Sequence, residues 1–315
     1  MNSVGHTTLL PTQWDALQTI FGERLQKNIP LARYTAARIG GFADAFLVAD
    51  SVSALAETVT KLWHLEIPFF ILGGGSNILV SDLGLREVVI LNRAKAITLD
   101  AGSESPSVFA ESGASFGQLA RKTASKGLSG LEWAAGVPGT VGGAVFGNAG
   151  AHGSDVAAGL ISADILHQDG QREDWPVEKL AYEYRSSILK KKNSSSVILA
   201  AKFKLTHSDP EKTKKQLEEY SDYRKRTQPP GASMGSMFKN PPGDYAGRLI
   251  EAAGLKGARM GSAEISPVHA NFFVSNGTTQ AADILKLIDL AKNTVLERFD
   301  IHLELEIELV GEWNT

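Results

Sequence analysis

Hydrophobic periodicity predicts several helices that each bury one face. Large apolar side chains recur every three or four positions at residues 12–27, 53–64 and 280–299. In the last segment we expect the apolar face to be ordinary core, formed by Ile284, Leu285, Leu287, Ile288, Ala291, Val295, Leu296 and Phe299. Ser115, followed three positions later by Gln118, has the spacing of a capping box and predicts the start of a further helix.

Short apolar or alternating runs predict strands between these helices. The runs are 43–50, 67–72, 87–91, 107–112, 161–168 and 197–205. The closing segment 303–310 alternates, with Leu303, Leu305, Ile307 and Leu309 on one face and Glu304, Glu306 and Glu308 on the other. Because strands dominate the first two thirds of the chain with a few helices among them, we expect an α+β fold.

A charged helix predicts a domain boundary. Asp209 is a good helix cap and Pro210 suits the first helical position, so we expect a helix that runs to about Arg226 and ends before Pro229. Its sequence is dominated by Lys, Arg, Glu and Asp, which is typical of a segment between domains.

Composition excludes several classes of protein. The chain has 315 residues, enough for two or three domains, and a net charge of −3, which argues against nucleic acid as a partner. It has no cysteine, so disulfides, cysteine zinc sites and thiol nucleophiles are excluded. No apolar run approaches the roughly 20 residues that span a bilayer, and we see no secretory signal. We therefore expect a cytoplasmic protein that binds no membrane.

Two glycine-rich segments are candidate ligand loops. Residues 136–150, GVPGTVGGAVFGNAG, hold too many glycines for a helix or central strand, yet small apolar residues separate them. We expect a buried, tightly turned loop whose backbone N–H groups meet a ligand; a compact structural loop is the alternative. Residues 73–77, GGGSN, follow a buried strand and match neither a P-loop nor GxGxxG. They bring N–H groups to a phosphate or form a plain strand turn.

Five polar residues could carry chemistry. Arg185 could bind a carboxylate or phosphate, and Ser236 could donate a proton if its neighbours assist. Lys239 and Asn240 could hold phosphate oxygens, and Glu306 could meet a cation in a cleft. Taken alone, each is more typical of a turn or a solvated surface. Neither of the two histidines His152 and His269 has a second ligand at a metal-binding spacing, so we expect no metal site.

Together these segments resemble the UDP-N-acetylenolpyruvoylglucosamine reductase family. ILGGGSNILVSD, GVPGTVGGAVFGNAG, YEYRSS, GSMFKNP, AGRLIEAAGLKG and LELEIELVG follow one another in the order and at the spacings of that family. The similarity implies an FAD-binding domain of the PCMH/vanillyl-alcohol-oxidase type at residues 1–208, with subdomains at about 1–92 and 93–208. It also implies an α+β substrate-binding domain at 209–315, whose last strand returns toward the active site.

The resemblance implies an enzyme that uses FAD and NADPH to reduce UDP-GlcNAc-enolpyruvate to UDP-N-acetylmuramate for peptidoglycan. By motif match, the catalytic residues would be the arginine Arg185, the proton donor Ser236 and the glutamate Glu306. Tyr184, Lys239 and Asn240 would bind the UDP-sugar. The residues that would bind FAD are Gly73, Gly74, Gly75, Ser76, Asn77, Gly136, Pro138, Gly139, Thr140, Gly142, Gly143, Asn148 and Gly150. We expect a monomer.

The chain is most similar to the second subtype of this family. The segment between YRSS and the strand at 197–205 is too short for the tyrosine-bearing loop that covers substrate in the first subtype. A small departure is LELEI, where LEPEV is common. Two alternatives stay open: a flavoenzyme of the same fold that oxidises an alcohol or sugar with O2, and a nucleotide-sugar binder without redox function.

Overall fold

The computed structural model describes residues 9–191 and 195–313. Contacts divide the chain into two compact units. The first unit comprises Met1–Leu47, Gly75–Val89 and Lys225–Thr315, and the second comprises Val48–Gly74 and Ile90–Arg224. The predicted boundary between an FAD-binding domain and a substrate-binding domain, at residue 208, stays a prediction.

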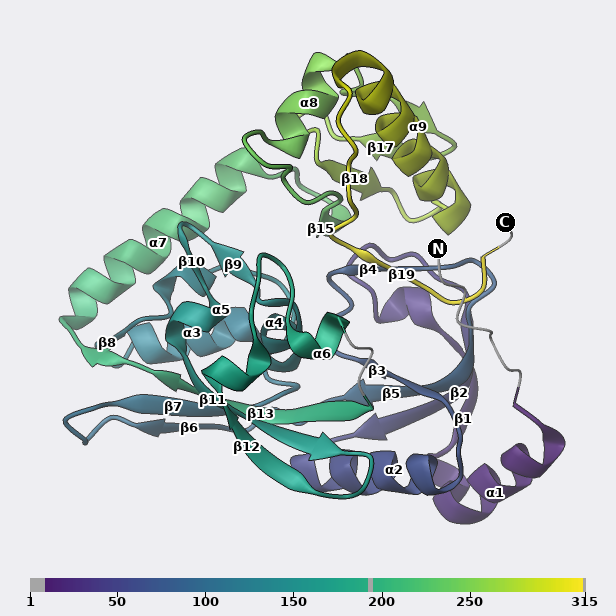
Figure 1. The fold of residues 1–315 in the computed structure, drawn as a ribbon, viewed down its shortest axis with the longest axis vertical. Helices are drawn as coiled ribbons and strands as arrows, with labels where there is room; N and C mark the ends of the chain where they lie inside the picture. The colour runs from purple at the N-terminus through teal and green to yellow at the C-terminus, as the bar shows by residue number, and fades with distance from the viewer. Residues whose placement is uncertain (1–8, 192–194, 314–315) are drawn as a thin grey trace. The chain divides into compact units, whose positions relative to one another are not determined.

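The N-terminal part of the first unit consists of one helix and strands of two small sheets. Its elements are α1 (Pro11–Phe21), β1 (Gln26–Pro30), β2 (Phe42–Ala49), β4 (Ile78–Val80) and β5 (Leu85–Asn92), with single 3₁₀ turns at Gly22–Arg24 and Leu31–Arg33. β1 pairs antiparallel with β2, and β2 lies next to β5. β2 and β5 continue into the second unit. The last strand of the chain, β19 (Glu308–Val310), pairs in parallel with β4, as Figure 1 shows in yellow beside blue.

The C-terminal part of the first unit is an antiparallel sheet with two helices. Its elements are β15 (Ala232–Ser236), α8 (Ala246–Ala252), β16 (Arg259–Met260), β17 (Ala263–Ile265), β18 (Phe272–Ser275) and α9 (Ala281–Phe299). The strand order is β15-β18-β17-β16. α9 buries most of the predicted apolar stripe in one core with Met234, Phe238 and Phe273. Three predicted positions are only half-buried: Leu285, Leu296 and Phe299.

The second unit is built around a five-stranded antiparallel sheet in the order β12-β11-β13-β7-β6. These strands are β6 (Ile97–Asp100), β7 (Ser107–Glu111), β11 (Leu160–His167), β12 (Arg172–Pro176) and β13 (Ser196–Lys204). Phe116, Trp133 and Phe203 lie at the centre of its core, where Phe116 contacts both other rings. Figure 1 shows this sheet with its helices.

Two long helices and several short elements complete the second unit. They are α2 (Val52–His64), β3 (Phe69–Leu72), α3 (Phe116–Ala124), β8 (Leu128–Ser129), α4 (Val141–Gly147), β9 (Gly150–Ala151), β10 (Ser154–Asp155), α5 (Val156–Gly159), α6 (Ile188–Lys191), β14 (Thr206–His207) and α7 (Pro210–Thr227), with 3₁₀ turns at Glu132–Ala134 and Val177–Leu180. α7 continues past the unit boundary. The hydroxyl of Ser115 accepts from the N–H of Gln118, which confirms the predicted start of α3.

The prediction that residues 136–150 contain no helix is wrong. α4 occupies seven of these residues, Val141–Gly147. Thr140 caps it by accepting from the N–H of Gly143 at 3.4 Å, and Asn148 ends it with a left-handed φ of 47°. Each helical glycine costs about 0.5–1 kcal/mol relative to alanine. The fold requires one at Gly142, because a Cβ there would lie 2.9 Å from the Cβ of Ser112.

The closing strand is shorter than predicted. Only β19 is continuous strand, and Leu305 makes an isolated bridge to Phe238. The segment changes partner between these two points, so the strict alternation of buried and exposed positions ends: Leu309 is exposed and Val310 is buried. None of the helices in the described ranges is long and apolar enough to cross a membrane.

Candidate active site

The two glycine-rich segments meet in the second unit. β3 leads directly into Gly73, where a Cβ would lie 2.6 Å from the Oγ1 of Thr140. A Cβ on Gly74 would lie 2.9 Å from the Cα of Gly139. Side chains essentially never approach so closely, so both positions require glycine. Gly73 and Gly74 of the first segment therefore lie directly against Thr140 and Gly139 of the second.

The GGGSN segment presents a row of backbone donors. Among the described residues, the N–H groups of Gly74, Gly75, Ser76 and Asn77 donate no hydrogen bond. Gly75 has a φ of 57°, and a Cβ there would lie 2.3 Å from the carbonyl oxygen of Tyr34. Successive N–H groups in a glycine turn form a concave binding site for anions such as phosphate. The turn therefore has donors for phosphate oxygens and no side chain that blocks them at Gly74.

The side chain of Asn148 bonds to the protein itself. Its Nδ2 donates to an oxygen of Asp155 at 3.3 Å and to the carbonyl of Glu183 at 3.1 Å, and its Oδ1 accepts from the N–H of Ala157 at 3.0 Å. The side chain is buried. Asn148 thus ends α4 and ties it to the YEYRSS segment, while Gly147 beside it has open space.

Arg185 lies on a tight turn in the second unit. Glu183 and Ser186 exchange backbone hydrogen bonds across the turn, and Arg185 adopts a left-handed φ of 56°. Its Nη2 donates to the carbonyl of Gly150 at 2.9 Å, and its guanidinium carbon lies 5.2 Å from the centre of the Tyr184 ring. Positive φ is costly for arginine. The contacts with Gly150 and Tyr184 therefore hold a strained residue whose charge is fixed.

Ser236 and Glu306 come together in the first unit. Ser236 ends β15 after a bulge at which Gly235 has a φ of 81°. The N–H of Glu306 donates to the carbonyl of Met237 at 2.9 Å, so Glu306 lies beside the residue that follows Ser236. The Nδ2 of Asn77 donates to the carbonyl of Glu306 at 3.1 Å. These backbone contacts place Asn77, Ser236 and Glu306 close together although they are far apart in the sequence.

Lys239 and Asn240 each have a partner within the first unit. The Nζ of Lys239 lies 3.2 Å from a carboxylate oxygen of Glu304. The Oδ1 of Asn240 accepts from the N–H of Ala246 at 3.1 Å, at the start of α8. Both residues follow Ser236 closely in the sequence. The side chain of Asn240 accepts a hydrogen bond from the first turn of α8.

Two structurally important residues were not predicted from the sequence. The carboxylate of Asp82 accepts from the N–H groups of Ala281 and Ala282 at 2.8 and 3.0 Å, so it caps α9. Asn271 is buried, and its side chain makes two hydrogen bonds to the backbone of Phe238: it accepts from the N–H at 2.9 Å and donates to the carbonyl at 2.8 Å. The available signal was an asparagine directly before the apolar run FFV.

The two histidines singled out earlier are packing residues. Burial lowers the pKa of His152, the charge of Arg224 lowers it further, and the ring stacks on Tyr220 with centroids 4.2 Å apart. Burial also lowers the pKa of His269, whose Nδ1 accepts from the N–H of Asn271 at 3.2 Å. Within residues 9–191 and 195–313, no group of three or more histidines, aspartates or glutamates could hold a metal ion.

Comparison with known families gives the class of protein. Residues 43–174 match an FAD-binding domain, and residues 226–310 match the C-terminal domain of UDP-N-acetylenolpyruvoylglucosamine reductase. The first match includes both glycine-rich segments, where the row of N–H donors fits the diphosphate of FAD. Fold and site therefore define an FAD-dependent oxidoreductase.

Full-length relatives give the particular family. A UDP-N-acetylenolpyruvoylglucosamine reductase from Chloroflexus aggregans is 43% identical over 91% of this chain and 97% of its own, and one from Bacillus subtilis is 43% identical over 90% and 93%. The crystal structure of the Thermus caldophilus enzyme covers 91% of this chain and 98% of its own, with 35% identity and a TM-score of 0.77. The chain belongs to the UDP-N-acetylenolpyruvoylglucosamine reductase family. The predicted α+β FAD-binding fold is confirmed.

Proposed function

We propose that this protein reduces the enolpyruvyl group of UDP-GlcNAc-enolpyruvate with NADPH and so makes UDP-N-acetylmuramate for peptidoglycan. The observation that carries this proposal is the meeting of Asn77, Glu306 and the residue after Ser236 within the first unit. It connects the GGGSN segment to the two acid–base candidates. In this proposal residues 1–208 serve FAD and residues 209–315 serve the substrate, while β19 returns to β4. A cytoplasmic monomer stays a prediction.

The residues proposed to hold FAD are those of the two glycine-rich segments. Gly73–Asn77 would supply N–H donors to the diphosphate, and the second segment would contribute Gly136, Pro138, Gly139, Thr140, Gly142, Gly143, Asn148 and Gly150. When bound, FAD supplies hydride transfer from NADPH to the substrate double bond. The glycines matter because a side chain would separate the backbone donors from the anion.

The remaining chemistry falls to side chains of this chain. Hydride addition to the terminal carbon of the enolpyruvyl group sends electrons toward the substrate carboxylate. Arg185 binds that carboxylate and stabilises the enolate that develops on it. Glu306 either holds a proton on the carboxylate or orients the arginine.

Ser236 donates the proton to the adjacent substrate carbon. Its side chain is half-buried, and its hydroxyl has no hydrogen-bond partner among the described residues, so it is available to a substrate. Serine is a weak acid, so the developing charge on the substrate must drive the transfer. Tyr184, Lys239 and Asn240 are the proposed contacts to the UDP-sugar.

A visible spectrum followed through both half-reactions tests the proposal. The purified protein should be yellow, bleach under anaerobic NADPH, and recover its colour on addition of UDP-GlcNAc-enolpyruvate. Protein that takes up no FAD would support a binder without redox function. Reduction of the flavin by an alcohol or sugar and reoxidation by O2, with no response to the enolpyruvyl substrate, would support an oxidase of the same fold.

A further inference from the structure

The closing strand β19 cannot fix its own register. It has three residues and pairs with β4, which also has three, so few ladder hydrogen bonds distinguish one alignment from another. Glu306 lies just before this strand, so its position depends on the alignment. A shift by one residue would move it by about 3.3 Å and turn its side chain to the other face.

Asn77 holds the leading end of β19. Its Nδ2 donates to the carbonyl of Glu306 at 3.1 Å, and its own carbonyl accepts from the N–H of Glu308 at 3.0 Å. One residue of the GGGSN segment therefore contacts the backbone on both sides of Ile307. This end alone leaves the far end of the strand free to fray.

The trailing end of β19 lies on the turn Ser81–Gly84. The N–H of Ser81 donates to the carbonyl of Val310 at 2.9 Å, and the N–H of Glu312 donates to the carbonyl of Gly84 at 3.3 Å. At Gly311 a Cβ would lie 2.4 Å from the carbonyl oxygen of Gly84. The two backbones thus pack in direct contact, and the chain continues straight to Glu312.

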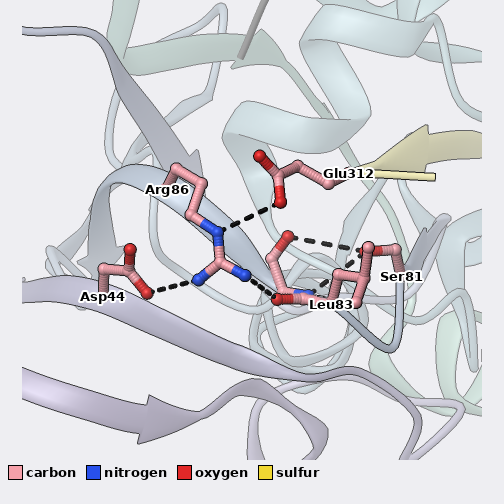
Figure 2. Close-up of polar contacts among 6 residues, drawn as sticks. Asp44, Ser81, Leu83, Arg86 and Glu312 are labelled. Carbon is pink, nitrogen blue, oxygen red and sulfur yellow. Dashed lines mark hydrogen bonds and ion pairs between the residues drawn. The ribbon is translucent and has the colours of Figure 1, made fainter. Parts of the chain in front are cut away.

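Arg86 connects three segments at this end, as Figure 2 shows. Its Nε donates to a carboxylate oxygen of Glu312 at 3.2 Å, its Nη1 to Asp44 at 2.6 Å, and its Nη2 to the carbonyl of Leu83 at 2.7 Å. The side chains of Arg86, Asp44 and Glu312 are 25%, 24% and 31% exposed, so the ion pairs are partly shielded from water. Burial lowers the pKa of Arg86, but the hydrogen bonds and charges of Glu312 and Asp44 outweigh it and raise the pKa overall.

We propose that Arg86 is a positioning residue for Glu306: it anchors Glu312 to β2 and to the Ser81–Gly84 turn, and so fixes the register of β19 on β4. The inference rests on the role proposed for Glu306. A planar guanidinium suits this task because its donors have fixed directions and its charge persists at any working pH. Functional groups must be held within about 0.5 Å, which three ladder positions do not guarantee.

The first test measures both half-reactions in Arg86→Gln with FAD bound. Reoxidation of reduced enzyme by UDP-GlcNAc-enolpyruvate should slow by about two- to fivefold, the size expected for partly exposed ion pairs. Flavin reduction by NADPH and FAD content should stay unchanged, Arg86→Lys should recover part of the loss, and Glu312→Gln should resemble Arg86→Gln. Arg172→Gln, which breaks the ion pair with Asp164 in the second unit, is the control.

A double variant shows whether Arg86 acts through Glu306. In a Glu306→Gln background, Arg86→Gln should cause no further loss, because the carboxylate it positions is gone. If the double variant loses the same factor again, Arg86 has a general structural role and the inference is wrong.

Hydrogen exchange tests the register without reference to catalysis. The amides of Glu306 and Glu308 donate hydrogen bonds to the carbonyls of Met237 and Asn77. They should therefore exchange faster in Arg86→Gln than in the parent protein or in Arg172→Gln. Unchanged exchange would overturn the inference. If instead Glu306→Gln alone leaves reoxidation intact, the role proposed for that glutamate fails, while the exchange result still decides whether Arg86 holds the strand.

Discussion

A bulge in the backbone of β15 sets the position of Ser236. The bulge at Gly235 turns the end of β15, and the next residue accepts from the N–H of Glu306. The side chain is half-buried and makes no hydrogen bond to another described residue, so its hydroxyl keeps its capacity to donate and accept.

Ser236→Ala should separate the two half-reactions. Flavin reduction by NADPH should persist, while reoxidation by the enolpyruvyl substrate should slow by about 10²–10⁴-fold, the usual loss of a positioned acid. Anaerobic stopped-flow absorbance measures both. Equal losses in the two half-reactions would remove the proton-donor role.

Glu306→Gln should impair reoxidation far more than Glu304→Gln. Glu306 is half-buried and held by contacts to Met237 and Asn77, whereas the side chain of Glu304 is 75% exposed and pairs with Lys239. The same stopped-flow assay compares the two variants at saturating substrate. Similar rates would show that the wrong glutamate was chosen.

Gly75→Ala should destabilise the protein more than Gly243→Ala. Both glycines have positive φ, at 57° and 77°, so alanine costs about 1–2 kcal/mol at either. At Gly75 a Cβ would also lie 2.3 Å from the carbonyl oxygen of Tyr34, whereas at Gly243 it meets nothing within 4 Å. Denaturant unfolding and FAD content measure the difference, and equal values would show that the turn relaxes freely.

At the scale of elements, α9 depends on a residue distant in sequence. Asp82 closes its N-terminus with both carboxylate oxygens. Asp82→Ala should lower the free energy of unfolding by about 1–2 kcal/mol, as helix caps do. Asp289→Asn, on the exposed face of the same helix, should change it little. Chemical denaturation checks both; a loss no larger than that of the control would mean that water replaces the cap.

Local signals predicted most elements but not the glycine-rich helix. Ser115 caps α3 where the sequence places it, because capping needs only neighbours along the chain. α4 was missed because the reason for its glycines lies elsewhere, in the approach of Ser112 to Gly142. Propensity is a local quantity, and tertiary packing overrode it here.

At the scale of the whole molecule, motif order identified the family where single residues could not. Arg185, Ser236 and Glu306 each look ordinary in isolation, and only their order among the other motifs gives them roles. The contacts of Asp82, Arg86 and Asn271 could not be predicted from the sequence, because each connects segments that are distant in the chain and share no local pattern. The sites of FAD, NADPH and UDP-sugar stay proposals that rest on those motifs.

The first unit is assembled from three separate stretches of chain, and the middle stretch, Gly75–Val89, carries the partners of the last one. A single cut therefore releases no self-sufficient half. Exchanging residues 225–315 alone between related enzymes would separate Glu312 from Arg86 and α9 from Asp82. An exchange that keeps these contacts must therefore carry residues 75–89 together with residues 225–315.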